Sequence, residues 1–89
     1  MLELPAELTH RQARACLQKL QQSLGEQTDS QVELDASSLQ RFDSSALSVL
    51  LEFRRTCERQ GKSLRLHGLR GQLADLAVLY GVADLLPPA

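Results

Sequence analysis

The pattern of apolar and polar positions divides the chain into alternating strands and helices. Apolar residues alternate with polar ones over 32–36 and again over 62–68, which is typical of strands with one buried face. The segment 1–8 carries three leucines and is interrupted by Pro5, so it predicts a short strand near an edge or a bulge. Residues 82–89 favour a short final strand that ends at two prolines.

Helical spacing fills the segments between these strands. The first predicted helix covers 9–25, where Thr9 and Gln12 fit a capping box and Gly25 is suited to a left-handed end. The third predicted helix ends at Gly81. Its predicted buried stripe consists of Leu69, Leu73, Leu76, Ala77 and Tyr80.

The second predicted helix runs from about Ser44 to Gln60 and ends at Gly61. Its apolar stripe is Ala46, Leu50, Phe53 and Cys57, and Leu47 and Leu51 widen it. Single helices between successive strands imply parallel neighbours and helices packed on the sheet. We therefore expect an α/β fold with a small, mostly parallel sheet, in one domain that covers residues 1–89.

Composition and charge exclude several classes of function. The 89 residues are 43% hydrophobic and 24% charged, with a formal net charge of -1. No overall basic field is available for nucleic acid, and the three aromatic residues do not alternate with basic ones. Neither a signal peptide nor a membrane span is recognisable, so we expect a soluble cytoplasmic protein with no direct membrane insertion.

Residue types that carry catalysis or bind cofactors are sparse. Cys16 and Cys57 are isolated, and the five glycines are scattered, so we expect no metal, no cofactor and no nucleotide-binding loop. A hydrolase built from Ser44 or Ser45, His67 and an aspartate would also need an oxyanion hole and a pocket. We therefore expect the protein not to be an enzyme.

The triplet Asp43-Ser44-Ser45 stands directly before the apolar second helix. Asp and Ser are preferred at helix N-termini because their side-chain oxygens accept from free backbone N–H groups. One cap explains one residue, however, and three polar residues are present. An apolar first half with small hydroxyls at its tip also suits a docking surface that includes Ser48. The pattern leaves both interpretations open.

The segment "VELDASSLQRFDSSALSVLLEFRRTCERQGKSLRLHGL" resembles the STAS domain, which occurs in anti-sigma-factor antagonists and transporter-associated proteins. The shared pattern is a strand that ends at Asp35, then Asp43-Ser44-Ser45 at the start of an apolar helix, then a further strand and helix. The resemblance covers nearly the whole chain and implies a single STAS-like domain.

Within that superfamily, "RFDSSALSVLLEF" and the tail "LADLAVLYGVADLLPP" are similar to the small cytoplasmic STAS subunits of Mla phospholipid-transport ABC systems, the MlaB family. The resemblance implies a non-catalytic subunit that binds and supports the ABC ATPase, with an inner-membrane permease in the full complex. Such a complex maintains the lipid asymmetry of the outer membrane, and the subunit is peripheral at the inner membrane. We expect the partner-binding residues to be Arg41, Asp43, Ser44, Ser45, Leu47 and Ser48, with Ser44 the functional hydroxyl.

An alternative comes from the same resemblance. Anti-sigma-factor antagonists use the second hydroxyl of the motif as a phosphate acceptor, which corresponds to Ser45, and a phosphate there would repel an acidic partner. Two departures from the pattern are Ala46, where glycine is usual, and a chain that begins directly in the first strand. The second departure implies either a short start or a sheet with one strand fewer and an exposed edge.

Overall fold

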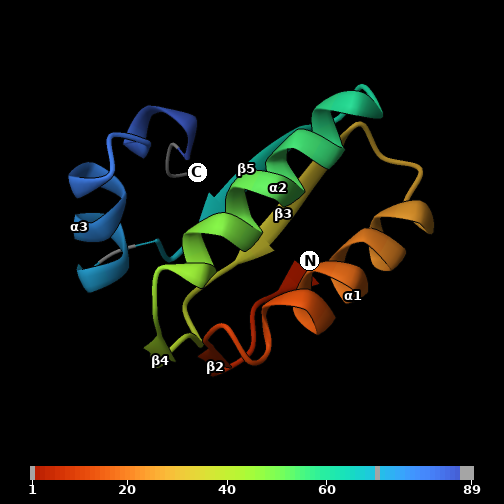
Figure 1. The fold of residues 1–89 in the computed structure, drawn as a ribbon. Coiled ribbons are helices and arrows are strands. Elements are labelled where there is room, and N and C mark those ends of the chain that lie inside the picture. Colours follow the sequence, from red (N-terminus) through yellow and green to blue (C-terminus); the bar gives the residue numbers. More distant parts are fainter. Residues whose placement is uncertain (1, 70, 87–89) are drawn as a thin grey trace.

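The computed structural model describes residues 2–69 and 71–86 and contains alternating strands and helices (Figure 1). The helices are α1 (Ala13–Gly25), α2 (Ser45–Arg59) and α3 (Gly71–Leu79), and the 3₁₀ turn η1 covers Ala83–Leu85. The strands are β1 (Leu2–Glu3), β2 (Glu7–Leu8), β3 (Gln31–Asp35), β4 (Arg41–Phe42) and β5 (Ser63–His67). The predicted α/β class is confirmed.

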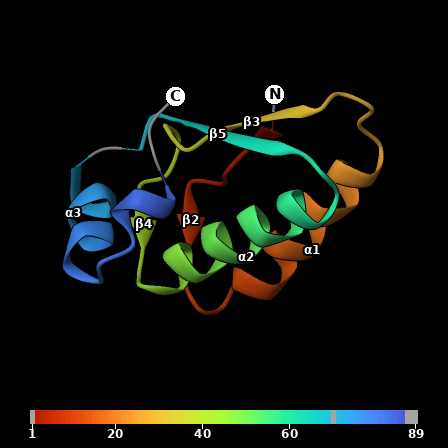
Figure 2. The same cartoon turned by 90° about the horizontal axis from the view of Figure 1, so that it is seen from above.

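The main sheet is parallel, with the strand order β1-β3-β5. Leu34 on the central strand pairs with Leu2 on one side and with Leu66 on the other. Both α1 and α2 lie on one face of this sheet (Figure 2). Leu34 and Leu66 are fully buried, whereas Arg65, next in sequence to Leu66, is exposed. The alternation of apolar and polar residues along the strands therefore corresponds to the covered and the open face of the sheet.

Helix α2 contributes more to the core than its predicted stripe. The whole stripe is buried, and Val49, Leu47 and Thr56 are buried with it. Thr56 is satisfied there because its hydroxyl donates to the Glu52 carbonyl at 3.0 Å and accepts from Gln21 Nε2 at 3.1 Å. The apolar first half of α2 therefore packs inside the protein itself.

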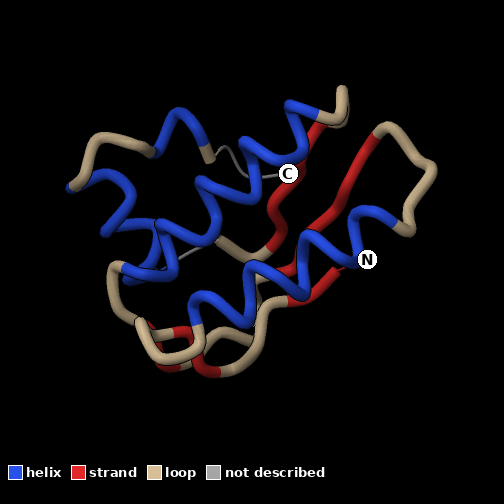
Figure 3. The backbone as a smooth tube through the Cα atoms, turned by 45° about the vertical axis from the view of Figure 1, so that its right-hand side comes forward, coloured by secondary structure: helices blue, strands red, loops and turns tan. Residues whose placement is uncertain are grey.

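A second, two-stranded sheet was not predicted. The expected strand at 1–8 is split around Pro5, so that β1 pairs with β3 whereas β2 pairs in parallel with β4. Proline has no N–H to donate to a ladder, and a chain commonly changes direction there. The small sheet lies apart from the main one (Figure 3). Because of it, the turn before α1 lies beside the start of α2.

Helix α1 differs from its prediction at both ends. It begins at Ala13, after a turn in which Gln12 Oε1 accepts from the Thr9 N–H at 2.9 Å and the Thr9 hydroxyl at 2.8 Å. This is one half of the expected capping box. The predicted left-handed end at Gly25 is wrong, because Gly25 is the last helical residue and its φ is not positive. The second and third helices end just before Gly61 (φ 72°) and Gly81 (φ 71°), as predicted, and both glycines have positive φ.

The C-terminal part differs most from its prediction. The expected final strand is wrong within the described residues, because η1 occupies its start and Leu86 is buried; residues 87–89 lie outside the described part. Leu73 and Ala77 of the predicted stripe are buried, but Tyr80 is 57% exposed. The helix ends at Leu79, and the left-handed turn at Gly81 follows, so Tyr80 does not continue the helical stripe.

Both cysteines are free thiols in the structure. Cys57 is buried and Cys16 is half-buried, and burial raises the pKa of each thiol above its ordinary value. A raised pKa lowers the thiolate fraction and therefore the reactivity. In the part of the chain that the structure describes, no helix has the length and apolar character needed to cross a membrane.

Candidate functional site

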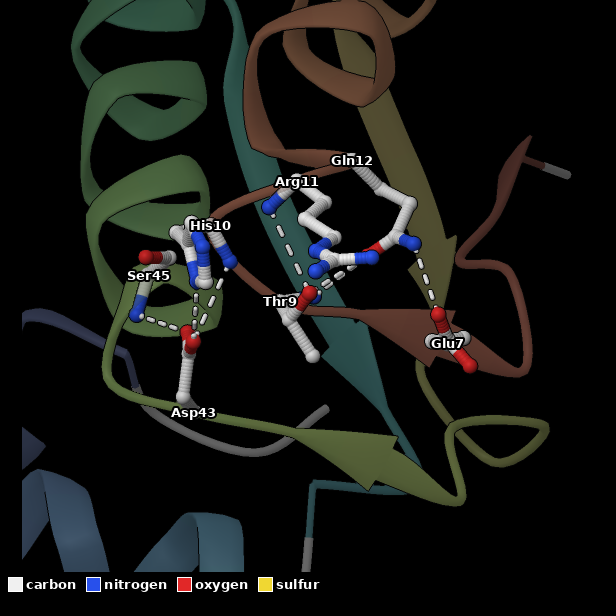
Figure 4. Close-up of polar contacts among 7 residues, drawn as sticks. All are labelled: Glu7, Thr9, His10, Arg11, Gln12, Asp43 and Ser45. Carbon is white, nitrogen blue, oxygen red and sulfur yellow. Dashed lines mark hydrogen bonds and ion pairs between the residues drawn. The ribbon is translucent and has the colours of Figure 1, made fainter.

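Asp43 joins the start of α2 to the turn before α1 (Figure 4). Its Oδ1 accepts from the Ser45 N–H at 2.8 Å, and its Oδ2 accepts from the His10 N–H at 3.1 Å. The His10 ring Nδ1 lies 3.3 Å from the same Oδ2. Hydrogen bonding, mainly from the Ser45 backbone N–H and then from His10, lowers the pKa of the Asp43 carboxyl to about 2. The aspartate is therefore the residue that caps α2 with its side chain.

The two serines of the motif have different surroundings. Ser44 is exposed, makes no side-chain capping bond, and has no hydrogen bond from its hydroxyl to another described residue. Ser45 is half-buried, and its backbone N–H donates to Asp43 Oδ1. Ser44 is thus the more exposed of the two serines and the more accessible to a partner.

Two hollows in the surface meet at Ser44 and Tyr80. The first measures about 480 Å³ and lies between β4, the tip of α2 and α3. It is lined by Phe42, Asp43, Ser44, Gln72, Asp75, Leu76, Leu79 and Tyr80. The second measures about 310 Å³ and is lined by Ser44, Leu47, Ser48, Leu51, Tyr80 and Val82. We call the residues of both hollows together the Ser44 surface.

Two large apolar side chains of this surface, Leu79 and Tyr80, are exposed. Among the described residues, the exposed large hydrophobic side chains all follow Ala77 in sequence: Val78, Leu79, Tyr80 and Leu85. Leu79 is 76% exposed and Tyr80 57%, and both line the first hollow. Sequence reasoning missed them because it assigned Tyr80 to the core. The available signal was the unbroken apolar run 76–80, which is longer than one buried stripe of a helix requires.

The other predicted site residues are divided between the Ser44 surface and its surroundings. Ser48 is exposed in the second hollow, and Leu47 forms its floor at only 3% exposure. Arg41 is not among the residues that line either hollow. It reaches Glu7 at 3.9 Å, and strand geometry points it to the opposite side from Phe42, its neighbour on β4.

The histidines do not form a catalytic relay with the serines. A Ser-His-Asp triad needs the imidazole between the serine and the acid. In the structure Asp43 stands between His10 and Ser45, and His67 Nε2 bonds to Glu33 Oε1 at 2.9 Å. Among the described residues, no group of three His, Cys, Asp or Glu side chains is placed to hold a metal ion.

The low pKa of Asp43 makes a pH dependence of stability testable. Its folded-state pKa, about 2, lies below the ordinary value of 3.8, so its contribution is fully present above about pH 4 and is lost as the pH falls toward 2. Asp43→Asn keeps an acceptor for the Ser45 N–H but removes the charge. We expect the variant to be less stable than the wild type at neutral pH and to approach it near about pH 2.

Urea unfolding midpoints of both proteins across this pH range measure the effect. A difference between the two midpoints that stays constant from neutral pH to about pH 2 would contradict this role of the carboxylate.

The fold and the motif together define the class of the protein. A parallel sheet covered on one face by helices, with Asp-Ser-Ser at the start of α2, is the arrangement expected of a STAS domain. The family model described as "Mlab, STAS domain" matches residues 1–87. The chain therefore belongs to the MlaB STAS-domain family.

A curated relative supports the same assignment. The chain is 40% identical over 53 residues to the "Intermembrane phospholipid transport system binding protein MlaB" of Haemophilus influenzae. The match covers 60% of this chain and 50% of the length of that relative.

Proposed function

We propose that the protein is a non-catalytic subunit of an intermembrane phospholipid-transport system. In this proposal it binds the ABC ATPase of the system on the cytoplasmic side of the inner membrane, supports or regulates that ATPase, and so contributes to outer-membrane lipid asymmetry. The name of the Haemophilus influenzae relative supports the transport role. The ATPase as partner is carried over from the resemblance of the whole chain to the STAS subunits of such systems.

The observation that carries the docking role is the exposure of Leu79 and Tyr80 beside Ser44, whose hydroxyl has no hydrogen bond to any described residue. Large apolar side chains at the surface are costly unless a partner covers them, and aromatic residues are enriched in the cores of interfaces. The small Ser44 side chain lets a partner approach the tip of α2 closely. The Ser44 surface therefore combines the exposed Leu79 and Tyr80 with the hydroxyls of Ser44 and Ser48.

The alternative, an anti-sigma-factor antagonist phosphorylated on Ser45, has weaker support. Ser45 is half-buried, whereas Ser44 is exposed. The Asp-Ser-Ser motif does not by itself separate the two functions, whereas the name of the Haemophilus influenzae relative is that of a transport protein.

The proposal is tested by photocrosslinking in the host cell. A photoreactive phenylalanine derivative at position 80 keeps an aromatic ring in the hollow, and the matched control places it at the exposed Arg65 on the open face of the sheet. We expect position 80, and not position 65, to yield a product that mass spectrometry identifies as an ABC ATPase. A product with a kinase instead would favour the alternative and contradict the proposal.

A further inference from the structure

The first hollow of the Ser44 surface combines apolar walls with an acidic rim. Leu76 and Leu79 from α3, and Tyr80 directly after it, form the apolar side. Asp43, at the start of α2, and Asp75, on α3, both line the same hollow. Two different elements therefore bring negative charge to the edge of one apolar depression.

This negative charge is not balanced within the described residues. Asp75 is exposed and makes no ion pair or hydrogen bond with another described side chain. Asp43 is ionised at neutral pH, and its neighbour His10 is the one titratable group that contacts it in the described structure. None of the described residues that line the hollow is a lysine or an arginine. The described lining therefore carries a net negative charge.

Resting on the proposed function, we infer that the element of the ABC ATPase that docks here presents an apolar side chain flanked by arginine or lysine. The apolar part fills the depression between α2 and α3, and the cation lies against Asp75 and Asp43. Charge complementarity of this kind accelerates association and rejects wrong partners. An acidic segment would meet two carboxylates without compensation.

The same charges argue against an anionic lipid as the occupant. A phospholipid could place an acyl chain against Leu79 and Tyr80, but its phosphate would then approach Asp75. We therefore expect no binding of the protein to vesicles of phosphatidylglycerol. Binding to such vesicles that competes with the ATPase would overturn the inference.

The test measures the affinity of purified wild-type protein and three variants for the purified cognate ATPase. Asp75→Asn removes the charge and Asp75→Lys reverses it. The control Glu26→Lys makes the same reversal at the exposed Glu26, directly after the C-terminal end of α1. At about 50 mM salt we expect Asp75→Asn to weaken binding about 5-fold and Asp75→Lys about 50-fold, with less than about 2-fold for Glu26→Lys. At about 500 mM salt the effect of Asp75→Lys should shrink at least about 3-fold.

The outcomes separate this inference from the proposed function. Wild-type binding together with undiminished binding by Asp75→Lys would leave the proposed function intact and overturn the inference. A loss of affinity in Asp75→Lys that is equal at both salt concentrations would also overturn the inference, because the shape of the new side chain rather than its charge would then explain the loss. An ATPase that does not bind the wild type at all would contradict the proposed function, and the inference would fall with it.

Discussion

Gly68→Ala should destabilise the protein by about 3 kcal/mol, which corresponds to a fall in melting temperature of about 15 °C. Gly68 follows β5 with a φ of 75°, and a Cβ there would lie 2.8 Å from both the backbone nitrogen and the Cβ of Ser37. Ser37 has little freedom to move because its N–H donates to Asp35 Oδ1 at 2.8 Å. The variant therefore combines an unfavourable backbone conformation with a clash against fixed backbone.

Gly61→Ala is the matched control for this effect. Gly61 has nearly the same φ, 72°, but a Cβ there meets nothing within 4 Å. Gly61→Ala should therefore destabilise the protein only by the cost of placing alanine in the left-handed region, about 1 kcal/mol. Urea or thermal unfolding of the two variants measures both effects. Equal losses in the two variants would show that the contact with Ser37 is not the source of the additional cost.

The main sheet was predictable because burial on one face leaves a period of two in the sequence. Val32 and Leu34 on β3 and Leu64 and Leu66 on β5 are apolar, and they are the residues that face the helices. The intervening helices are long enough to show helical spacing. A parallel arrangement then follows from single-helix connections.

The small sheet and the contact between Asp43 and His10 were not predictable in the same way. A two-residue strand has no period, and the pairing of β2 with β4 joins segments more than thirty residues apart. The sequence indicated a cap within Asp43-Ser44-Ser45, but nothing in it indicates that the Asp43 carboxylate also accepts from the N–H of His10, 33 residues earlier. Such contacts depend on tertiary packing rather than on local pattern.

The candidate site was predictable in part. The Asp-Ser-Ser motif indicated Ser44 as a site residue. In the structure its hydroxyl has no hydrogen-bond partner among the described residues. The contribution of α3 was missed because amphipathic spacing assigns every apolar residue near the stripe to the core. In the structure Leu79, the last residue of α3, and Tyr80, directly after it, lie at the surface.

Ser44→Arg should lower the affinity for the ATPase about 100-fold or more, which is about 2.7 kcal/mol. Ser44 lines both hollows, so a long cationic side chain at this position would occupy the space that a partner needs. A cation at the acidic rim would also repel the basic segment that we infer for the partner. Ser44 is exposed, so the substitution should leave the stability of the protein nearly unchanged.

Ser30→Arg provides the same change of residue at a control position. Ser30 is exposed and directly precedes β3. It therefore lies at the N-terminal end of this strand, whereas the chain leaves the C-terminal end, at Asp35, toward β4 and Ser44. Its affinity for the ATPase should stay within about 2-fold of the wild type. Equal weakening by both variants would point to a general effect of added positive charge rather than to a defined surface.

The most direct test of the central claim is a calorimetric titration of the purified ATPase with the wild-type protein and with Ser44→Arg. We predict saturable binding of the wild type and a loss of about 100-fold in affinity for Ser44→Arg, with both proteins unfolding at the same temperature. Undiminished binding by a folded Ser44→Arg protein, or no binding by the wild type, would contradict the assignment of the Ser44 surface as the ATPase-docking site.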